Sequence, residues 1–166
     1  MTQTLLAEDP DQDGVQDTQH QYVTFLVDDR SYGIDINLVR EIKQWSATTA
    51  LPHQPSYTRG VLNLRGTIVP VHDLRARFTG ERTETSASHV IVIVWIGTKT
   101  VGILVDAVSD IISVAEQDIK QVPNGHVGGE AATISGLVSG DDLMVAILDL
   151  GALFPNIEDT ASGAHG

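Results

Sequence analysis

The sequence contains no cysteine. Disulfide bonds, thiolate nucleophiles and cysteine-ligated zinc are therefore excluded, and the absence suits a cytosolic protein. Long apolar runs are also missing: the longest strongly apolar segment, Val90–Ile96, has the length of a strand and is too short to span a bilayer. The N-terminus lacks the basic and apolar regions of a secretory signal. These features predict a cytoplasmic protein with no direct membrane insertion.

Positive charge is scarce. The 166 residues carry a formal net charge of -12, with 22 acidic residues against 10 Lys and Arg. Nucleic-acid binding is not expected, because phosphate recognition requires concentrated positive potential. Seven of the 22 acidic residues lie before residue 20 or after residue 154, whereas every Lys and Arg lies between these two end segments. We expect disordered tails over residues 1–19 and 156–166, because these polar segments have little to bury.

Motifs for catalysis or metal binding are missing or incomplete. Asp9–Gly14 copies the opening of an EF-hand calcium loop, but His20 stands where the bidentate glutamate is required. Nucleophile-elbow, phosphate-loop and dinucleotide motifs are absent. The acidic pairs Asp28-Asp29 and Asp141-Asp142 fall at expected hairpin turns, where aspartate is favoured. We predict no enzyme activity, cofactor or metal; the alternative is a small β-barrel hydrolase or ligand-binding domain using the acidic turns with His72, which is expected on an exposed strand face.

The stretch Arg59–Phe78 organises the chain. Apolar and polar residues alternate on both sides of Arg65-Gly66, which predicts two short strands joined by a two-residue turn. Gly66 can adopt a positive φ, and the turn holds the Arg65 guanidinium in solvent. Asp73 is expected to cap a short helix that Gly80 ends.

Much of the chain occurs twice. Tyr22–Ile42 aligns without a gap with Ile91–Ile111, so that glycine meets glycine and turn meets turn. Gly60–Phe78 aligns in the same way with Gly136–Phe154. The extra residues between the two aligned blocks of the second copy are rich in glycine and are readily absorbed by a loop.

We infer two β subdomains of similar plan, about residues 20–80 and 89–155, joined by the polar linker 79–88. Many short strands with turn signals between them predict small barrels, because no long crossover helix is available to connect parallel strands. The run Val90–Ile96 predicts a strand covered on both faces, where the halves pack together. Strand exchange between the halves would move the border of the subdomains.

The central hairpin resembles the signature of the CheW family, the adaptors of bacterial and archaeal chemotaxis signalling. The matching residues are Arg59-Gly60-Val61, Asn63-Leu64-Arg65-Gly66, Ile68-Val69-Pro70-Val71 and Asp73-Leu74. The resemblance covers about residues 20–155. It implies an all-β fold with short helices, in which two SH3-like five-stranded β-barrel subdomains pack around a shared hydrophobic core.

The resemblance also implies a partner-binding surface around Arg65 and Glu41. Glu41 is expected to end a short helical turn capped by Asn37 and to lie close to the arginine. The second repeat has Asp141-Asp142 at the corresponding turn, so the architecture does not demand an arginine there. Binding is the more economical explanation, and ordinary surface solubility is the alternative. The predicted partner-binding residues are Arg65, Glu41, Gly66, Asn63, Leu62, Val39 and Ile36. For the three apolar ones, a plain place in the core is the alternative.

The function implied by the resemblance is that of a non-catalytic adaptor. It would couple the cytoplasmic helical hairpins of chemoreceptors, the methyl-accepting chemotaxis proteins, to the regulatory domain of the histidine kinase CheA in signalling arrays. Other CheW-like domains would join it in rings, and the protein would act in the cytoplasm beside membrane-bound receptors. The alternative within the same fold is a scaffold of another chemosensory system, such as one for surface motility.

Overall fold

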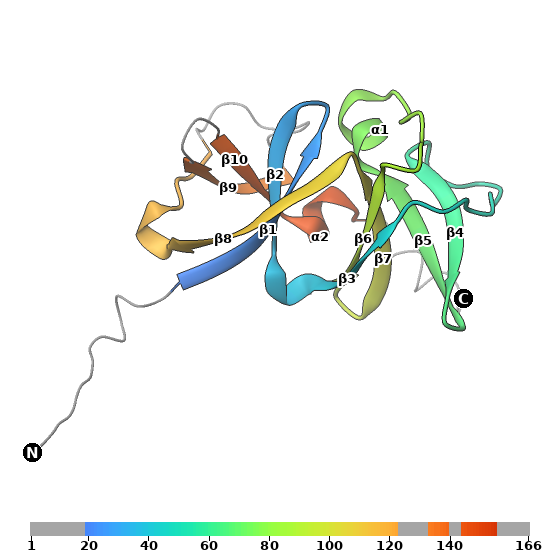
Figure 1. Ribbon diagram of the computed structural model, residues 1–166, viewed down its shortest axis with the longest axis horizontal. Helices are drawn as coiled ribbons and strands as arrows, with labels where there is room; N and C mark the ends of the chain where they lie inside the picture. Colours follow the sequence, from blue (N-terminus) through green and yellow to red (C-terminus); the bar gives the residue numbers. More distant parts are fainter. Residues whose placement is uncertain (1–18, 123–132, 140–143, 156–166) are drawn as a thin grey trace, which may run out of the picture.

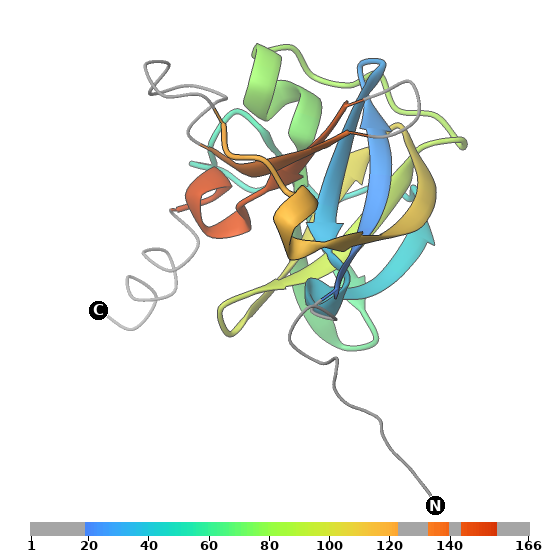
Figure 2. The same cartoon turned by 90° about the vertical axis from the view of Figure 1, so that its left-hand side faces the viewer.

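The computed structural model describes residues 19–122, 133–139 and 144–155 of the chain. They form two five-stranded sheets with only short helices, which confirms the predicted all-β class. The sheets lie side by side in Figure 1, and Figure 2 turns the first of them toward the viewer. The predicted tails, apart from Gln19, which begins a strand, fall outside the described residues, as do the calcium-loop copy Asp9–Gly14 and the Asp141-Asp142 turn.

The first sheet joins the two ends of the described chain. Its order is β8 (Ala107–Ala115), β1 (Gln19–Val27), β2 (Arg30–Asp35), β10 (Met144–Leu148) and β9 (Ile134–Ser139). The second sheet is built from the middle of the chain. Its order is β3 (Val39–Gln44), β6 (Val90–Ile96), β7 (Lys99–Val105), β5 (Thr67–Asp73) and β4 (Thr58–Leu64). The short helices α1 (Leu74–Thr79) and α2 (Leu150–Leu153) follow β5 and β10.

The two sheets do not follow the two sequence repeats. The first sheet combines the opening hairpin of the first repeat, β1–β2, with the last three strands of the second. The second sheet combines the opening hairpin of the second repeat, β6–β7, with the last three strands of the first. Each strand therefore has a repeat-related counterpart at the same place in the other sheet. The linker 79–88 is not the border between the sheets, because the repeats have exchanged their hairpins.

One pairing in each sheet is parallel, and the other pairings are antiparallel. β10 pairs with β2 and β5 pairs with β7, and in both cases the partners come from different repeats, so no tight crossover is needed. Ile147 stands opposite Gly33, and Val71 stands opposite Gly102. A Cβ added at Gly33 would lie 2.9 Å from Ile147 Cδ1, so glycine admits this close approach.

The apolar residues form one shared core and a smaller cluster inside each barrel. The shared core takes Phe25 and Ile34 from the first sheet, Val92 and Ile103 from the second, and Phe154 beyond α2. Strand β6 supplies side chains to two clusters: Val92, Val94 and Ile96 enter the shared core, whereas Ile91 and Ile93 enter the second barrel. This confirms the prediction of a strand covered on both faces, although the side chain of Trp95 is exposed.

The segment before β3 departs from the expected helical turn. A 3₁₀ turn covers Ile36–Leu38, and its cap is Asp35, whose side chain accepts a hydrogen bond from the Asn37 backbone N–H. Glu41 belongs to strand β3 and does not end a helix. An aspartate side chain can accept from the backbone N–H two residues further on. Asp35, rather than the predicted Asn37, therefore caps the turn.

Within the described part of the chain, no helix has the length and apolar character required to cross a membrane.

Candidate functional site

The turn between β4 and β5 has the predicted two-residue form. Arg65 and Gly66 have φ angles of 51° and 90°, the left-handed values that a tight hairpin turn requires. The Gly66 backbone N–H donates to Asn63 Oδ1 at 2.8 Å, which fixes the turn from within. Asp73 caps α1 by accepting from the Ala76 backbone N–H, and Gly80 ends the helix with a φ of 83°. Each of these local predictions is confirmed.

Arg65 reaches across to Glu41. Its Nη2 atom donates to both carboxylate oxygens, at 3.0 and 3.1 Å. The ion pair joins the β4–β5 turn to β3, and these lie at opposite edges of the second sheet. The Arg65 side chain is 66% exposed, so the pair contributes about 0–1 kcal/mol to stability. Its main physical effect is to hold the two side chains in one arrangement at the surface.

The other predicted binding residues belong to different parts of the structure. Asn63 and Gly66 belong to the turn that positions the arginine. Leu62 is buried inside the second barrel, so it is a core residue, as the stated alternative had it. Val39 is half-buried and packs against the shared core, and Ile36 is half-buried in the 3₁₀ turn.

Two exposed isoleucines near this site were missed. Ile68 is 60% exposed and stands opposite Asn63 in the hairpin, and Ile42 follows Glu41 and is 46% exposed. The signal for Ile68 was present, because the strand alternation sets it apart from the inward Val69. Successive side chains of a strand point to opposite faces, so Ile42 lies on the other face of β3 from Glu41. Ile68, on the hairpin that carries Arg65, is an exposed apolar side chain of the kind that a protein partner covers.

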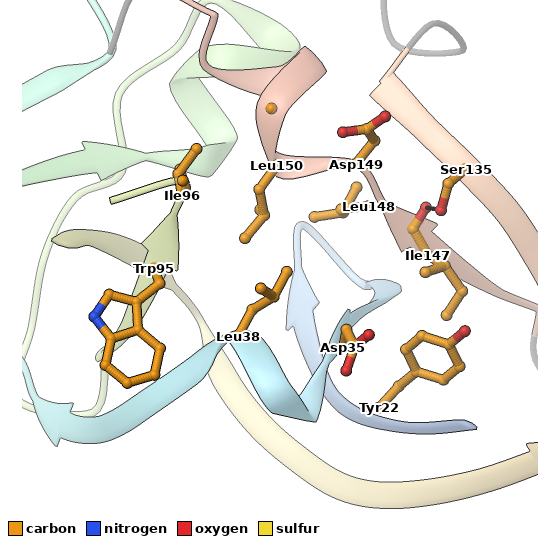
Figure 3. A pocket seen from close by; sticks show the side chains of 12 residues that line it. Tyr22, Asp35, Leu38, Trp95, Ile96, Ser135, Ile147, Leu148, Asp149 and Leu150 are labelled. Carbon is orange, nitrogen blue, oxygen red and sulfur yellow. Dashed lines mark hydrogen bonds between the residues drawn. The ribbon is translucent and has the colours of Figure 1, made fainter. Parts of the chain in front are cut away.

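A groove between the two sheets is the second candidate site, and sequence reasoning supplied none of its lining (Figure 3). Its volume is about 350 Å³. Apolar side chains form most of the lining, and the carboxylates of Asp35 and Asp149 lie among them (Figure 3). The lining residues are Tyr22, Asp35, Leu38, Trp95, Ile96, Gly97, Ser135, Ile147, Leu148, Asp149, Leu150 and Gly151. They come from both sheets and from segments far apart in sequence, so no local pattern marks them.

His72 was expected on an exposed strand face, and this is wrong. The residue is 5% exposed, and its ring stacks on Phe154 with centroids 4.8 Å apart and meets Tyr57 edge-on. Its Nδ1 lies 3.0 Å from Thr58 Oγ1, whereas Nε2 is buried without a hydrogen-bond partner. The second half packs Phe154 over this face of β5, which period-two alternation within one strand cannot reveal.

Burial lowers the pKa of His72 to about 4, so the folded protein holds the ring neutral. The unfolded chain binds this proton near pH 6.5, so stability from the neutral ring is present above that pH and is lost as the pH falls toward 4. Between pH 7 and 4.5 we expect His72 to lower the free energy of unfolding by about 2–3 kcal/mol. Urea denaturation at the two pH values measures the change.

A His72→Leu variant is the matched control, because Leu148 occupies the equivalent position of the second repeat. The surroundings of the ring are Tyr57, Thr58 and Phe154, with the Arg77 guanidinium stacked over Tyr57. The variant should lose most of the extra acid sensitivity. Equal pH dependence in both proteins would show that His72 is not its source.

The arrangement offers little for a reaction. Among the described residues no group of three or more His, Asp or Glu side chains is placed to hold a metal ion. Asp28 and Asp29 form a turn with φ angles of 54° and 65°, and Asp28 pairs with Arg75 at 3.0 Å. Among the described residues, the side chains in contact with the His72 ring are those of Tyr57, Thr58 and Phe154, and none is a carboxylate.

Comparison with known proteins identifies relatives along most of the chain. The model of the CheW-like domain matches residues 21–158. The probable chemotaxis protein CheW of Rhizobium etli is 37% identical over 142 residues, 86% of this chain and 92% of the relative. The chemotaxis protein CheW of Rhizobium meliloti is 35% identical over the same shares of both chains. The crystal structure of the scaffolding protein TtCheW from Thermoanaerobacter tengcongensis superimposes with a TM-score of 0.75 at 34% identity, covering 82% of this chain and 88% of that one.

The fold defines the class of the protein as a double β-barrel. Two exchanged barrels share a core, one carries an exposed ion pair, and a groove lies between them. The chain belongs to the CheW family.

Proposed function

We propose that this protein is a non-catalytic chemotaxis adaptor that couples chemoreceptor cytoplasmic hairpins to the histidine kinase CheA. The observation that carries the proposal is family membership along most of the sequence, residues 21–158, with relatives named as chemotaxis proteins. The protein acts in the cytoplasm, at arrays of membrane-bound receptors. Other CheW-like domains join it there in rings.

The two candidate sites suit two partners. The Arg65–Glu41 surface contacts the regulatory domain of the kinase, with Asn63 and Gly66 holding the turn in shape. A planar guanidinium on an exposed turn is suited to carboxylate recognition, and the exposed Ile68 of the same hairpin supplies apolar contact area. The intersheet groove contacts the receptor hairpin, as an apolar groove takes the apolar face of a helix.

Weak contacts of this kind gain strength from repetition. Once one partner is bound, the second binding event becomes effectively intramolecular, so the array is more stable than its separate interfaces. A small change in how the receptor and kinase are held relative to one another would transmit the signal, and the adaptor needs no reaction of its own.

The test is reconstitution with purified components from one organism. The full chain should bind the regulatory domain of CheA and the receptor hairpin separately, and should bind both together in one complex in analytical ultracentrifugation. Receptor control of kinase autophosphorylation should require the chain. Binding to neither partner, or kinase control that persists without the chain, would refute the proposal.

A further inference from the structure

Asp73 and Asp149 occupy equivalent positions in the two repeats. Each follows the last strand of its repeat and caps the next helix, accepting from the backbone N–H of Ala76 or Ala152. The backbone N–H of Asp73 donates to a carbonyl oxygen at 2.7 Å, and that of Asp149 donates to the equivalent carbonyl at 2.8 Å. The two carboxylates are therefore presented by the same local structure.

Their surroundings differ. The Asp73 side chain is fully buried and accepts from the backbone N–H and the hydroxyl of Thr83, both at 2.7 Å. Arg59 Nη1 lies 3.4 Å from it and neutralises its charge. The linker thus supplies two hydrogen-bond donors to the first carboxylate through Thr83, and strand β4 supplies the cation through Arg59.

Asp149 has no such cover among the described residues. It is exposed at the groove, and Ser135 stands where the first repeat has Arg59 (Figure 3). Ser135 directs its hydroxyl to the Ile147 carbonyl instead. The second repeat therefore has the carboxylate of the first repeat but not the arginine that pairs with it.

The groove is open because the second repeat lacks an ion pair that the first repeat has. On the first-repeat side, Arg75 of α1 forms a 3.0 Å ion pair with Asp28 of the β1–β2 turn and bridges the two walls. The equivalent residues on the other side are Gly151 and Gly97, and both line the groove. Two glycines therefore replace the side chains that close the repeat-related space.

The groove also carries negative charge. The described residues that line it include no Lys or Arg, whereas Asp35 stands with Asp149 in the lining. Burial raises the pKa of Tyr22 in the same lining, and the charges of Asp35 and Glu116 raise it further. A ligand that enters the groove meets an apolar floor and an unneutralised carboxylate.

We propose that the groove recognises its partner through a cationic side chain, arginine or lysine, that pairs with Asp149 and takes the place that Arg59 fills in the first repeat. This inference rests on the proposed function, in which the partner is the receptor hairpin. The apolar face of one receptor helix packs on the groove floor, and its cation lies beside Asp149 with Asp35 as the second carboxylate. The carboxylates thus set the orientation of the helix in the groove.

An Asp149→Asn variant tests the charge, and Glu84→Gln is its control, because Glu84 is an exposed acid of the linker with the same change of net charge. Binding of the receptor hairpin to the full chain is measured by calorimetry at low and moderate salt. Asp149→Asn should weaken binding about tenfold and flatten its salt dependence, whereas the control should match the wild type. If the wild type binds and Asp149→Asn binds equally well, the charge inference fails and the proposed function stands. If the wild type binds the kinase domain but not the hairpin, the receptor half of the proposed function fails as well.

A second variant closes the groove. Gly97→Asp with Gly151→Arg recreates the ion pair of the first repeat. The backbone at Gly97 suits aspartate, because Asp28, at the equivalent position, has a φ of 54°, similar to that of Gly97. A Cβ at Gly151 would meet only Asp149 Oδ1, at 3.6 Å, so the change fits without strain. The double variant should lose receptor binding while keeping kinase-domain binding and its circular dichroism spectrum. Receptor binding at the wild-type level in a folded double variant would exclude the groove as the site.

Discussion

Reversing the charge of Arg65 will weaken binding to the regulatory domain of CheA by about tenfold or more and will leave the protein folded. The side chain is 66% exposed, so its removal costs little in burial, and the ion pair with Glu41 contributes about 0–1 kcal/mol to stability. In Arg65→Glu, a partner carboxylate would face two acidic side chains, Glu41 and the introduced glutamate. Repulsion between like charges is among the stronger ways to reject a protein surface. Calorimetric titration measures the affinity, and a circular dichroism melt measures the stability.

The exchanged pair is the control for this prediction. Glu41→Arg combined with Arg65→Glu restores an ion pair between the same two positions, so stability should return to the wild-type level. Binding should stay weak, because the guanidinium no longer stands on the turn. Unfolding of Arg65→Glu would return the arginine to a structural role, and unchanged binding would remove the turn from the kinase interface.

The local features of the chain were predictable because short-range chemistry decides them. The Arg65-Gly66 turn, the Asp73 cap and the Gly80 stop each depend on the conformational preferences of one or two residues. The repeat was visible too, since both halves keep the same turns and caps. The Arg65–Glu41 contact came from resemblance to a family, because the two residues are separated by a long connector.

The remaining features arise from contacts between the repeats. A hairpin has the same sequence pattern whether it pairs with strands of its own repeat or of the other repeat. The exchange of β1–β2 and β6–β7 is therefore not visible in the sequence. His72 alternates as an exposed residue should, until Phe154 packs over it from the other repeat. The groove depends on glycines at positions 97 and 151, which are conspicuous only when compared with Asp28 and Arg75 in the folded protein.

Removing the Asp73 carboxylate will have the largest effect on stability of any single change discussed. In Asp73→Ala, the Thr83 N–H and hydroxyl and the Arg59 guanidinium lose their buried acceptor, and α1 loses its cap. Breaking a buried ion pair by removing one partner costs about 3–5 kcal/mol, because the remaining charge is left without compensation. The linker is anchored at Thr83 through this carboxylate, so its amide protons should also exchange faster with solvent.

Asp149→Ala provides an internal comparison for that loss. Asp149 is the equivalent of Asp73 and caps α2. Among the described residues, no cation or buried hydroxyl binds its carboxylate. Loss of a cap alone costs about 1 kcal/mol, so urea denaturation should separate the two variants by about 2–4 kcal/mol. Equal losses would mean that Thr83 and Arg59 find other partners and that the linker is held elsewhere. A clear separation would show that Thr83 and Arg59 make the Asp73 carboxylate contribute more to the fold than the Asp149 carboxylate does.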